Sequence, residues 1–205
     1  MVPIYRELAR LHRVGRAPLR RGRTFNLDEL RVAARDPRSF RFFMERHLFS
    51  KVDLPREKIH FLCGDAPDTE GECLRYEREL ARYGPPDLAL VGIGTNGHVA
   101  YVEPGRALPP RTALVRLSAS TRRDLASGGM KPVPREALSM GIETILSARE
   151  ILLVAVGKRK ARAVRAALEG PVSPGCPASF LSLHPRLTVL LDRAGASRLS
   201  WPQSG

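Results

Sequence analysis

The chain has 205 residues, 43% of them hydrophobic, which suffices for one sizeable core but not for two comfortable domains. Its net charge of +13 comes mainly from arginines spread along the chain, without a basic tail, a zinc-finger pattern or an aromatic RNA-binding motif. No apolar run approaches the roughly 20 residues that cross a bilayer, and the N-terminus does not have the pattern of a signal peptide. We therefore expect a cytoplasmic protein with neither a membrane contact nor a specific nucleic-acid partner.

The three cysteines give no sign of a structural or metal framework. Cys63, Cys73 and Cys176 are odd in number and show no C-x-x-C spacing. This pattern predicts three reduced thiols rather than a disulfide set or a zinc site. We expect no metal and no cofactor.

The front part of the chain alternates helical and extended patterns. Residues 3–14 carry apolar side chains at helical spacing, and residues 23–27 read as a strand that ends at Asp28. Asp28 is therefore expected at the carboxyl end of a strand. The following elements are predicted as a helix over 39–48, a strand over 59–62 and a helix over 71–83.

A nearly continuous apolar run over residues 88–93, ended by glycine, predicts a strand buried on both faces. Further strands are predicted over 114–117, 151–156 and 187–191, with helices over 158–168 and 178–183. This alternation indicates an α/β fold, Rossmann-like and doubly wound, with a mainly parallel sheet. We expect a single domain over residues 1–194 and a frayed tail over 195–205.

The segment GIGTNGHVAYVEP follows the strand predicted over 88–93. Ligands of open α/β sheets bind beyond the carboxyl ends of the strands. Gly92, Gly94 and Gly97 allow a tight turn whose N–H groups can approach an anion. The glycines also match the dinucleotide pattern G-x-G-x-x-G, but the segment continues to a proline rather than into a helix, which argues against a dinucleotide.

His98 is the histidine that follows this glycine turn directly, and its imidazole can exchange protons near neutral pH. Asn96 lies two residues before it and Glu103 five residues after it, so one loop can bring an amide and a carboxylate to the ring. From spacing alone, a catalytic histidine and a structural histidine are equally good interpretations.

The loop sequence GIGTNGHVAYVEP resembles the ring-opening loop of the glucosamine-6-phosphate deaminases. Other segments resemble the same family in order and spacing, and together they cover almost the whole chain. They are TFNLDEL, GDAPDTEGECLRYEREL, VPREALSMGIETILSAREILLVAVG and SFLSLHP.

This resemblance implies an aldose–ketose isomerisation with deamination, which converts glucosamine 6-phosphate to fructose 6-phosphate and ammonia. Asp28 would move a proton between carbons 1 and 2 of the open-chain sugar, and His98 would open the pyranose ring. Asn96 and Glu103 would orient the imidazole and tune its charge. On the structural alternative, Asp28 caps a helix and Glu103 is a loop carboxylate held by an arginine.

A phosphate site is predicted at Lys160, which lies at the start of a helix after a buried strand. The resemblance implies a phosphate-binding lysine at this place as well. Arg122 is the second candidate for the phosphate, with Arg123 as an alternative. The small-molecule partner is thus expected to be a sugar phosphate, and the resemblance also implies assembly into a homo-oligomer.

The chain departs from the family pattern at two places. The family begins with a strand and a Ser/Thr-Gly-Gly phosphate loop that do not precede Met1, and Ser127 falls where an arginine commonly faces the phosphate. Either the reading frame starts too late, or part of the site has been lost. Two alternative functions follow, namely a non-catalytic or impaired sugar-phosphate-binding homologue and a hydrolase of the 6-phosphogluconolactonase type.

Overall fold

Three small sheets organise residues 1–200, the part of the chain that the computed structural model describes. The first contains β4 (Ala89–Gly92), β7 (Ile151–Ala155) and β8 (Leu187–Leu191), which are all parallel and lie in the order β4-β7-β8. Two more parallel strands, β1 (Thr24–Phe25) and β3 (Ile59–His60), form the second sheet. These strands confirm the α/β class and its parallel pairing.

The third sheet is antiparallel and was not expected. Its central strand β6 (Glu136–Ser139) pairs with β2 (Asp28–Leu30) on one side and with β5 (Ala113–Arg116) on the other. Alternate residues of β5 are exposed, as is typical of an antiparallel strand with one face in water. The single, mainly parallel sheet predicted from the sequence is therefore replaced by a mixed arrangement, because the pairing of short strands is set by the tertiary fold.

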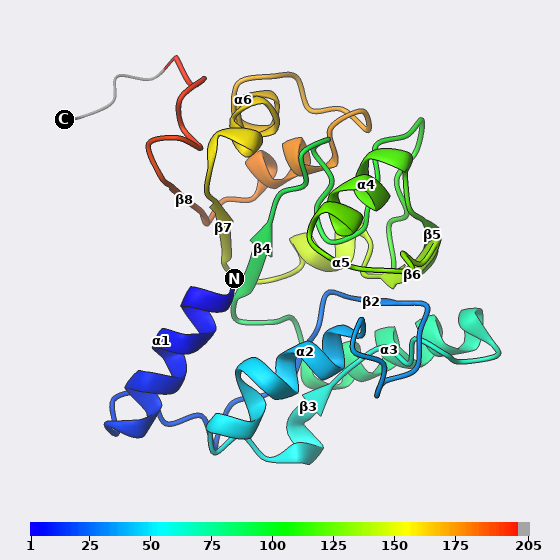
Figure 1. Ribbon diagram of the computed structural model, residues 1–205, viewed down its shortest axis with the longest axis vertical. Coiled ribbons are helices and arrows are strands. Elements are labelled where there is room, and N and C mark those ends of the chain that lie inside the picture. Colours follow the sequence, from blue (N-terminus) through cyan, green and yellow to red (C-terminus); the bar gives the residue numbers. More distant parts are fainter. Residues whose placement is uncertain (201–205) are drawn as a thin grey trace.

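Helices pack around these sheets, as Figure 1 shows. α1 and α2 lie with α3 and β3 at one end, and α6 lies beside β7 and β8 at the other. The helices are α1 (Val2–Arg13), α2 (Phe40–His47), α3 (Thr69–Tyr83), α4 (Ala119–Ser127), α5 (Ile142–Leu146) and α6 (Ala161–Leu168). Short 3₁₀ helices are η1 (Phe49–Lys51), η2 (Arg56–Lys58), η3 (Lys158–Lys160) and η4 (Pro177–Leu183). The helix predicted over 178–183 is thus a 3₁₀ helix.

Asp28 begins a strand rather than ending one. β1 stops at Phe25, and the N–H group of Asn26 makes the last hydrogen bond toward β3, to the carbonyl of His60. The chain then changes partner, because the carbonyl of Leu27 accepts a hydrogen bond from the N–H group of Met140, next to β6. The expectation of Asp28 at a carboxyl end is therefore wrong, and the residue lies at the junction of two sheets.

The largest core cluster lies between the β4-β7-β8 sheet and helices α3, α5 and α6. Val91 and Leu153 at its centre are fully buried, which accounts for the apolar runs of β4 and β7. These strands are neighbours in register, so their carboxyl ends meet at one edge of the sheet. The glycine loop after β4 and the helical turn after β7 consequently lie side by side.

The start of the predicted tail is attached to the body of the protein. The N–H group of Gly195 donates to Asp192, Leu199 packs against the main core, and the N–H group of Ser200 donates to Glu169. Residues 201–205 of that segment lie outside the described residues. The domain boundary at residue 194 stays a prediction.

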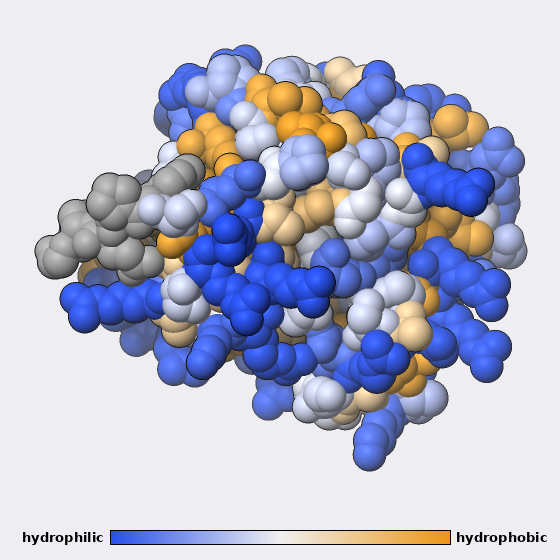
Figure 2. All heavy atoms as spheres, turned by 90° about the horizontal axis from the view of Figure 1, so that it is seen from above, coloured by the Kyte–Doolittle hydropathy of each residue, from blue (hydrophilic) through white to orange (hydrophobic). Residues whose placement is uncertain are grey.

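Hydrophilic side chains cover most of the face that Figure 2 shows, with smaller hydrophobic patches between them. This agrees with the arginines being spread along the chain. Among residues 1–200, no helix is long and apolar enough to cross a membrane. The same residues contain no group of three or more His, Cys, Asp or Glu side chains arranged to hold a metal ion.

Candidate active site

The loop after β4 folds tightly around His98. The N–H group of Gly94 donates to the carbonyl of His98 at 2.8 Å, and that of Gly97 donates to the carbonyl of Gly94 at 3.1 Å. A Cβ atom on Gly94 would lie 2.3 Å from the imidazole atoms Cε1 and Nδ1. Glycine at position 94 therefore lets the ring lie directly against the backbone.

Of the other two glycines, Gly97 is required by its surroundings and Gly92 is not. Gly97 has φ +91°, and a Cβ atom there would lie 2.8 Å from Sγ of Cys176. The loop before η4 thus packs against this turn, and the N–H group of Ala178 donates to the carbonyl of Gly97. At Gly92 the nearest atoms would be 3.8 Å away, an ordinary contact, so this position has no steric need for glycine.

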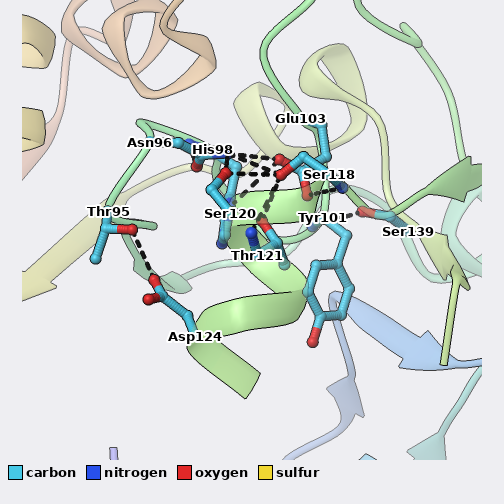
Figure 3. Close-up of polar contacts among 10 residues, drawn as sticks. All are labelled: Thr95, Asn96, His98, Tyr101, Glu103, Ser118, Ser120, Thr121, Asp124 and Ser139. Atoms are coloured by element: carbon cyan, nitrogen blue, oxygen red, sulfur yellow. Dashed lines mark hydrogen bonds and ion pairs between the residues drawn. The ribbon is translucent and has the colours of Figure 1, made fainter. Parts of the chain in front are cut away.

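The imidazole of His98 lies among polar groups from the loop and from α4 (Figure 3). Its Nδ1 atom is 3.1 Å from Oγ1 of Thr121 and 3.7 Å from Oε2 of Glu103. The first distance is a hydrogen bond, and the second is an ion-pair distance when the ring is protonated. The side chain of His98 is 16% exposed, so the ring is held from one side and can be reached from the other.

Glu103 is surrounded by hydrogen-bond donors. Its Oε2 accepts from Nδ2 of Asn96 at 2.7 Å, and its Oε1 accepts from the N–H group of Ser118 at 3.0 Å. Burial alone would raise the pKa of Glu103, but the polar groups of His98, Thr121, Ser118 and Asn96 around the carboxylate lower it to about 2. The carboxylate therefore stays ionised beside the imidazole.

Sequence reasoning missed Ser118 and Thr121. Ser118 is the N-cap of α4, and its Oγ accepts from the N–H group of Thr121 at 3.2 Å. A serine just before a helix is a recognisable start signal, so the segment LSAST carried evidence for this cap. The signal does not show that the cap also contacts a loop some twenty residues earlier in the chain.

Asp28 is connected to this cluster by strand β6. In the antiparallel pair of β2 and β6, Asp28 lies opposite Ser139, whose Oγ accepts a hydrogen bond from the N–H group of Tyr101 at 3.1 Å. The Tyr101 ring lies 6.0 Å from the imidazole of His98, and the Asp28 charge helps to raise the pKa of the Tyr101 hydroxyl, after burial as the main cause. The structure thus brings Asp28 and the His98 loop to one site.

The Asp28 carboxylate accepts no hydrogen bond from the residues that the structure describes. Burial raises its pKa to about 7, with a smaller contribution from the charge of Glu29. A carboxyl group with a pKa near 7 can both take and return a proton at neutral pH.

Glu29 has a structural position. Its carboxylate is buried and accepts from the Ser39 hydroxyl and from the N–H groups of Phe40 and Arg41 at the start of α2. Ser39 is the N-cap of α2, and Glu29 rather than Asp28 is the carboxylate that adds acceptors for the first N–H groups of the helix.

Lys160 lies in η3, after β7 and directly before α6. It is half-buried, and burial lowers the pKa of its ammonium group, with Arg159 acting in the same direction and Asp124 in the opposite one. Arg122 lies part-exposed on α4, and its guanidinium makes no hydrogen bond or ion pair within residues 1–200. Ser127, the last residue of α4, is exposed.

Comparison with known proteins shows the family of the chain. Residues 1–189 match the model of the family described as glucosamine-6-phosphate isomerases/6-phosphogluconolactonase. The chain is 47% identical to glucosamine-6-phosphate deaminase 1 of Giardia intestinalis, over 93% of this chain and 73% of that protein. It is 43% identical to glucosamine-6-phosphate deaminase 1 of Bacillus subtilis, over 94% and 81% of the two chains.

A solved structure of a monomeric glucosamine-6-phosphate deaminase superposes with a TM-score of 0.93 at 42% identity, covering 97% of this chain and 83% of that one. The 6-phosphogluconolactonase of Trypanosoma brucei superposes with a TM-score of 0.72 at 22% identity, which shows a common fold. The extent and identity of these matches establish that the chain belongs to the glucosamine-6-phosphate deaminase family.

Proposed function

We propose that this protein is a glucosamine-6-phosphate deaminase, which converts glucosamine 6-phosphate and water to fructose 6-phosphate and ammonia. The observation that carries the proposal is the contact between the His98 loop and β6, opposite Asp28. Two groups able to exchange protons at neutral pH thereby share one site.

In this proposal His98 opens the sugar ring. The imidazole takes the proton of the hydroxyl on carbon 1 and gives it to the ring oxygen. The bond between carbon 1 and the ring oxygen breaks, and carbon 1 becomes the aldehyde of the open chain. Thr121 and Glu103 fix the ring from the Nδ1 side, so the other nitrogen is available to the substrate. Asn96 holds Glu103 in turn.

Asp28 then moves the proton between the carbons. Its carboxylate takes the proton from carbon 2 and, as the protonated acid, returns it to carbon 1. In the same conversion the oxygen on carbon 1 gains a proton and the amino nitrogen loses one, so the product is a ketose imine at carbon 2. Water hydrolyses this imine to the ketose and ammonia. A pKa of about 7 suits both halves of this transfer, because neither protonation state is strongly disfavoured.

The substrate phosphate is assigned to Lys160, with Arg122 as a second ligand and the glycine loop beside it. The half-buried position of Lys160 supports its role, and the free guanidinium of Arg122 supports the second. The homo-oligomer that the resemblance implies stays a prediction. The solved relative with 42% identity is described as monomeric.

The test is release of ammonia and fructose 6-phosphate from glucosamine 6-phosphate. We expect turnover by the wild type and loss of turnover, with an unchanged fold, in His98→Ala, because His98 lies on a loop outside the sheets. Arg162→Gln, an exposed change on α6, serves as the control and retains wild-type turnover.

A non-catalytic sugar-phosphate-binding protein is the second candidate, favoured by the uncharged Ser127 on α4. The same assay separates the two, since such a protein binds the substrate without releasing ammonia. Hydrolysis of 6-phosphogluconolactone in place of deamination would instead support the lactonase alternative and contradict the proposal.

A further inference from the structure

The ammonium group of Lys160 has no acceptor within residues 1–200, neither a hydrogen bond nor an ion pair. The residue is nevertheless half-buried, which lowers its pKa. The charge of Asp124 acts on the ammonium from a distance, but a part-buried ammonium without a hydrogen-bond acceptor destabilises a fold unless an anion completes the site. α6, which begins at the next residue, has no acidic side chain in its first turn and no side-chain cap. This end of the helix also favours an anion.

Arg159, directly before Lys160, is fixed on one side. Its Nη2 donates to Oδ1 of Asp124 on α4 at 2.5 Å, and Oδ2 of Asp124 accepts from Oγ1 of Thr95 at 2.6 Å. Thr95 belongs to the same loop as His98, and Figure 3 shows it reaching Asp124. A chain of two hydrogen bonds thus connects the His98 loop to the guanidinium of Arg159.

The remaining donors of Arg159 are available. Its side chain is 69% exposed, and its Nε and Nη1 have no partner in the part of the chain that the structure describes. A guanidinium presents several N–H donors in a planar fork, so one edge can bind Asp124 while another binds a phosphate. Ser127, which lies one turn after Asp124 on the same face of α4, carries no charge.

Resting on the proposed function, we propose that Arg159 is a phosphate-binding residue that acts together with Lys160. The anion would lie at the start of α6, between the ammonium and the free edge of the guanidinium. Arg159 thereby supplies a second cation from the same turn as Lys160. The pair would select sugar phosphates over the unphosphorylated amino sugars.

A second basic region provides the control. Arg162, Arg165 and Arg198 line a separate groove of about 570 Å³ that includes neither Arg159 nor Lys160. Arg162→Gln removes the same charge as Arg159→Gln, three residues along the chain. General loss of positive charge would affect both variants equally, whereas a specific phosphate contact would affect Arg159→Gln alone.

The experiment measures KM and kcat for glucosamine 6-phosphate in the wild type, Arg159→Gln and Arg162→Gln, and the Kd for inorganic phosphate by calorimetry. A lost charge-assisted contact predicts that Arg159→Gln raises both KM and the phosphate Kd about tenfold to a hundredfold. kcat is expected to stay within about threefold, because the contact is uniform between bound substrate and transition state. Arg162→Gln should match the wild type.

Equal KM and phosphate Kd in the two variants would overturn the proposal and leave Arg159 as a surface ion pair of Asp124. A wild type that binds phosphate without turning over glucosamine 6-phosphate would contradict the proposed function instead. In that case the phosphate titrations of the two variants still decide on Arg159.

Discussion

Asp28 and Glu103 lie near the same site, yet their surroundings shift their pKa values in opposite directions. Asp28 is part-buried without hydrogen-bond donors from the described residues, and its pKa rises to about 7. Glu103 is part-buried as well, but it accepts hydrogen bonds from Asn96 and Ser118 and lies beside His98 and Thr121, and its pKa falls to about 2. The contrast shows that burial alone does not determine the charge of a carboxylate, because the donors around it decide the outcome. One group is thereby suited to moving protons and the other to holding a fixed negative charge.

Among the variants that we consider, Asp28→Asn should have the largest effect on activity. The amide keeps the shape but cannot take a proton, so we expect kcat to fall on the order of 10³-fold. Exchange of the hydrogen on carbon 2 with deuterated water, followed by NMR, should stop as well. Exchange at the wild-type rate would show that another residue is the base.

The same variant has an expected effect on stability. The pKa of Asp28 rises from 3.8 to about 7 on folding, so the stability that it contributes is complete below pH 3.8 and is lost as the pH rises to about 7. An asparagine does not titrate, so Asp28→Asn does not lose stability in this way. The free energy of unfolding of the variant, relative to that of the wild type, should therefore rise as the pH rises from 3.8 to about 7. Urea unfolding of both proteins at pH 5 and pH 8 measures this. The same difference in unfolding free energy between wild type and variant at the two pH values would contradict the prediction.

Glu103→Gln probes the opposite shift. The pKa of Glu103 falls from 4.5 to about 2 on folding, so its contribution is complete above pH 4.5 and is lost as the pH falls toward 2. The contribution is on the order of 3 kcal/mol, and the variant should lose roughly this much at pH 7. The control is Glu143→Gln, since Glu143 is 61% exposed on α5. Equal unfolding midpoints in the two variants would contradict the claim that the hydrogen bonds to Glu103 stabilise the fold.

Gly94→Ala and Gly92→Ala form a matched pair in the loop that carries His98. A methyl group at position 94 meets the imidazole at 2.3 Å, whereas one at position 92 finds its nearest atom at 3.8 Å. Displacing a reacting group by about 1 Å can cost about a hundredfold in rate, so we expect this loss in Gly94→Ala and none in Gly92→Ala. Steady-state kinetics on both variants checks this, and equal losses would mean that the ring does not lie against Gly94 during turnover.

Thr121→Val should have the smallest effect. It removes the hydrogen bond to Nδ1 of His98 and keeps the shape of the buried side chain. A neutral hydrogen bond contributes about 0.5–1.5 kcal/mol, so kcat should fall about twofold to tenfold. Ser120→Ala is a suitable comparison, because Ser120 contacts Asn96 and not the imidazole. A larger loss in Ser120→Ala would make Asn96, rather than Thr121, the group that orients the ring.

The site could be predicted in part because its loop follows a strongly apolar strand. The run that became β4 and the glycines after it located His98, Asn96 and Glu103 within one short segment. These three residues could be grouped from the sequence because they lie close together along the chain.

Contacts between distant segments could not be predicted in the same way. Thr121 meets His98, and Arg159 meets Asp124, only after β4, β7 and α4 have packed together. The prediction that Asp28 ends a strand was also wrong, since its strand β2 is short and the partner strand β6 lies more than a hundred residues later. Pairing between such short strands depends on the tertiary fold rather than on their own sequence.

The most direct test of the comparison is a carboxyl ¹³C NMR titration of the wild type, assigned with Asp28→Asn and Glu103→Gln. The structure predicts that the Asp28 carboxyl group titrates near pH 7, while Glu103 stays ionised down to about pH 2. If both groups instead titrated at their ordinary values near 4, neither burial at Asp28 nor the donors around Glu103 would act as described.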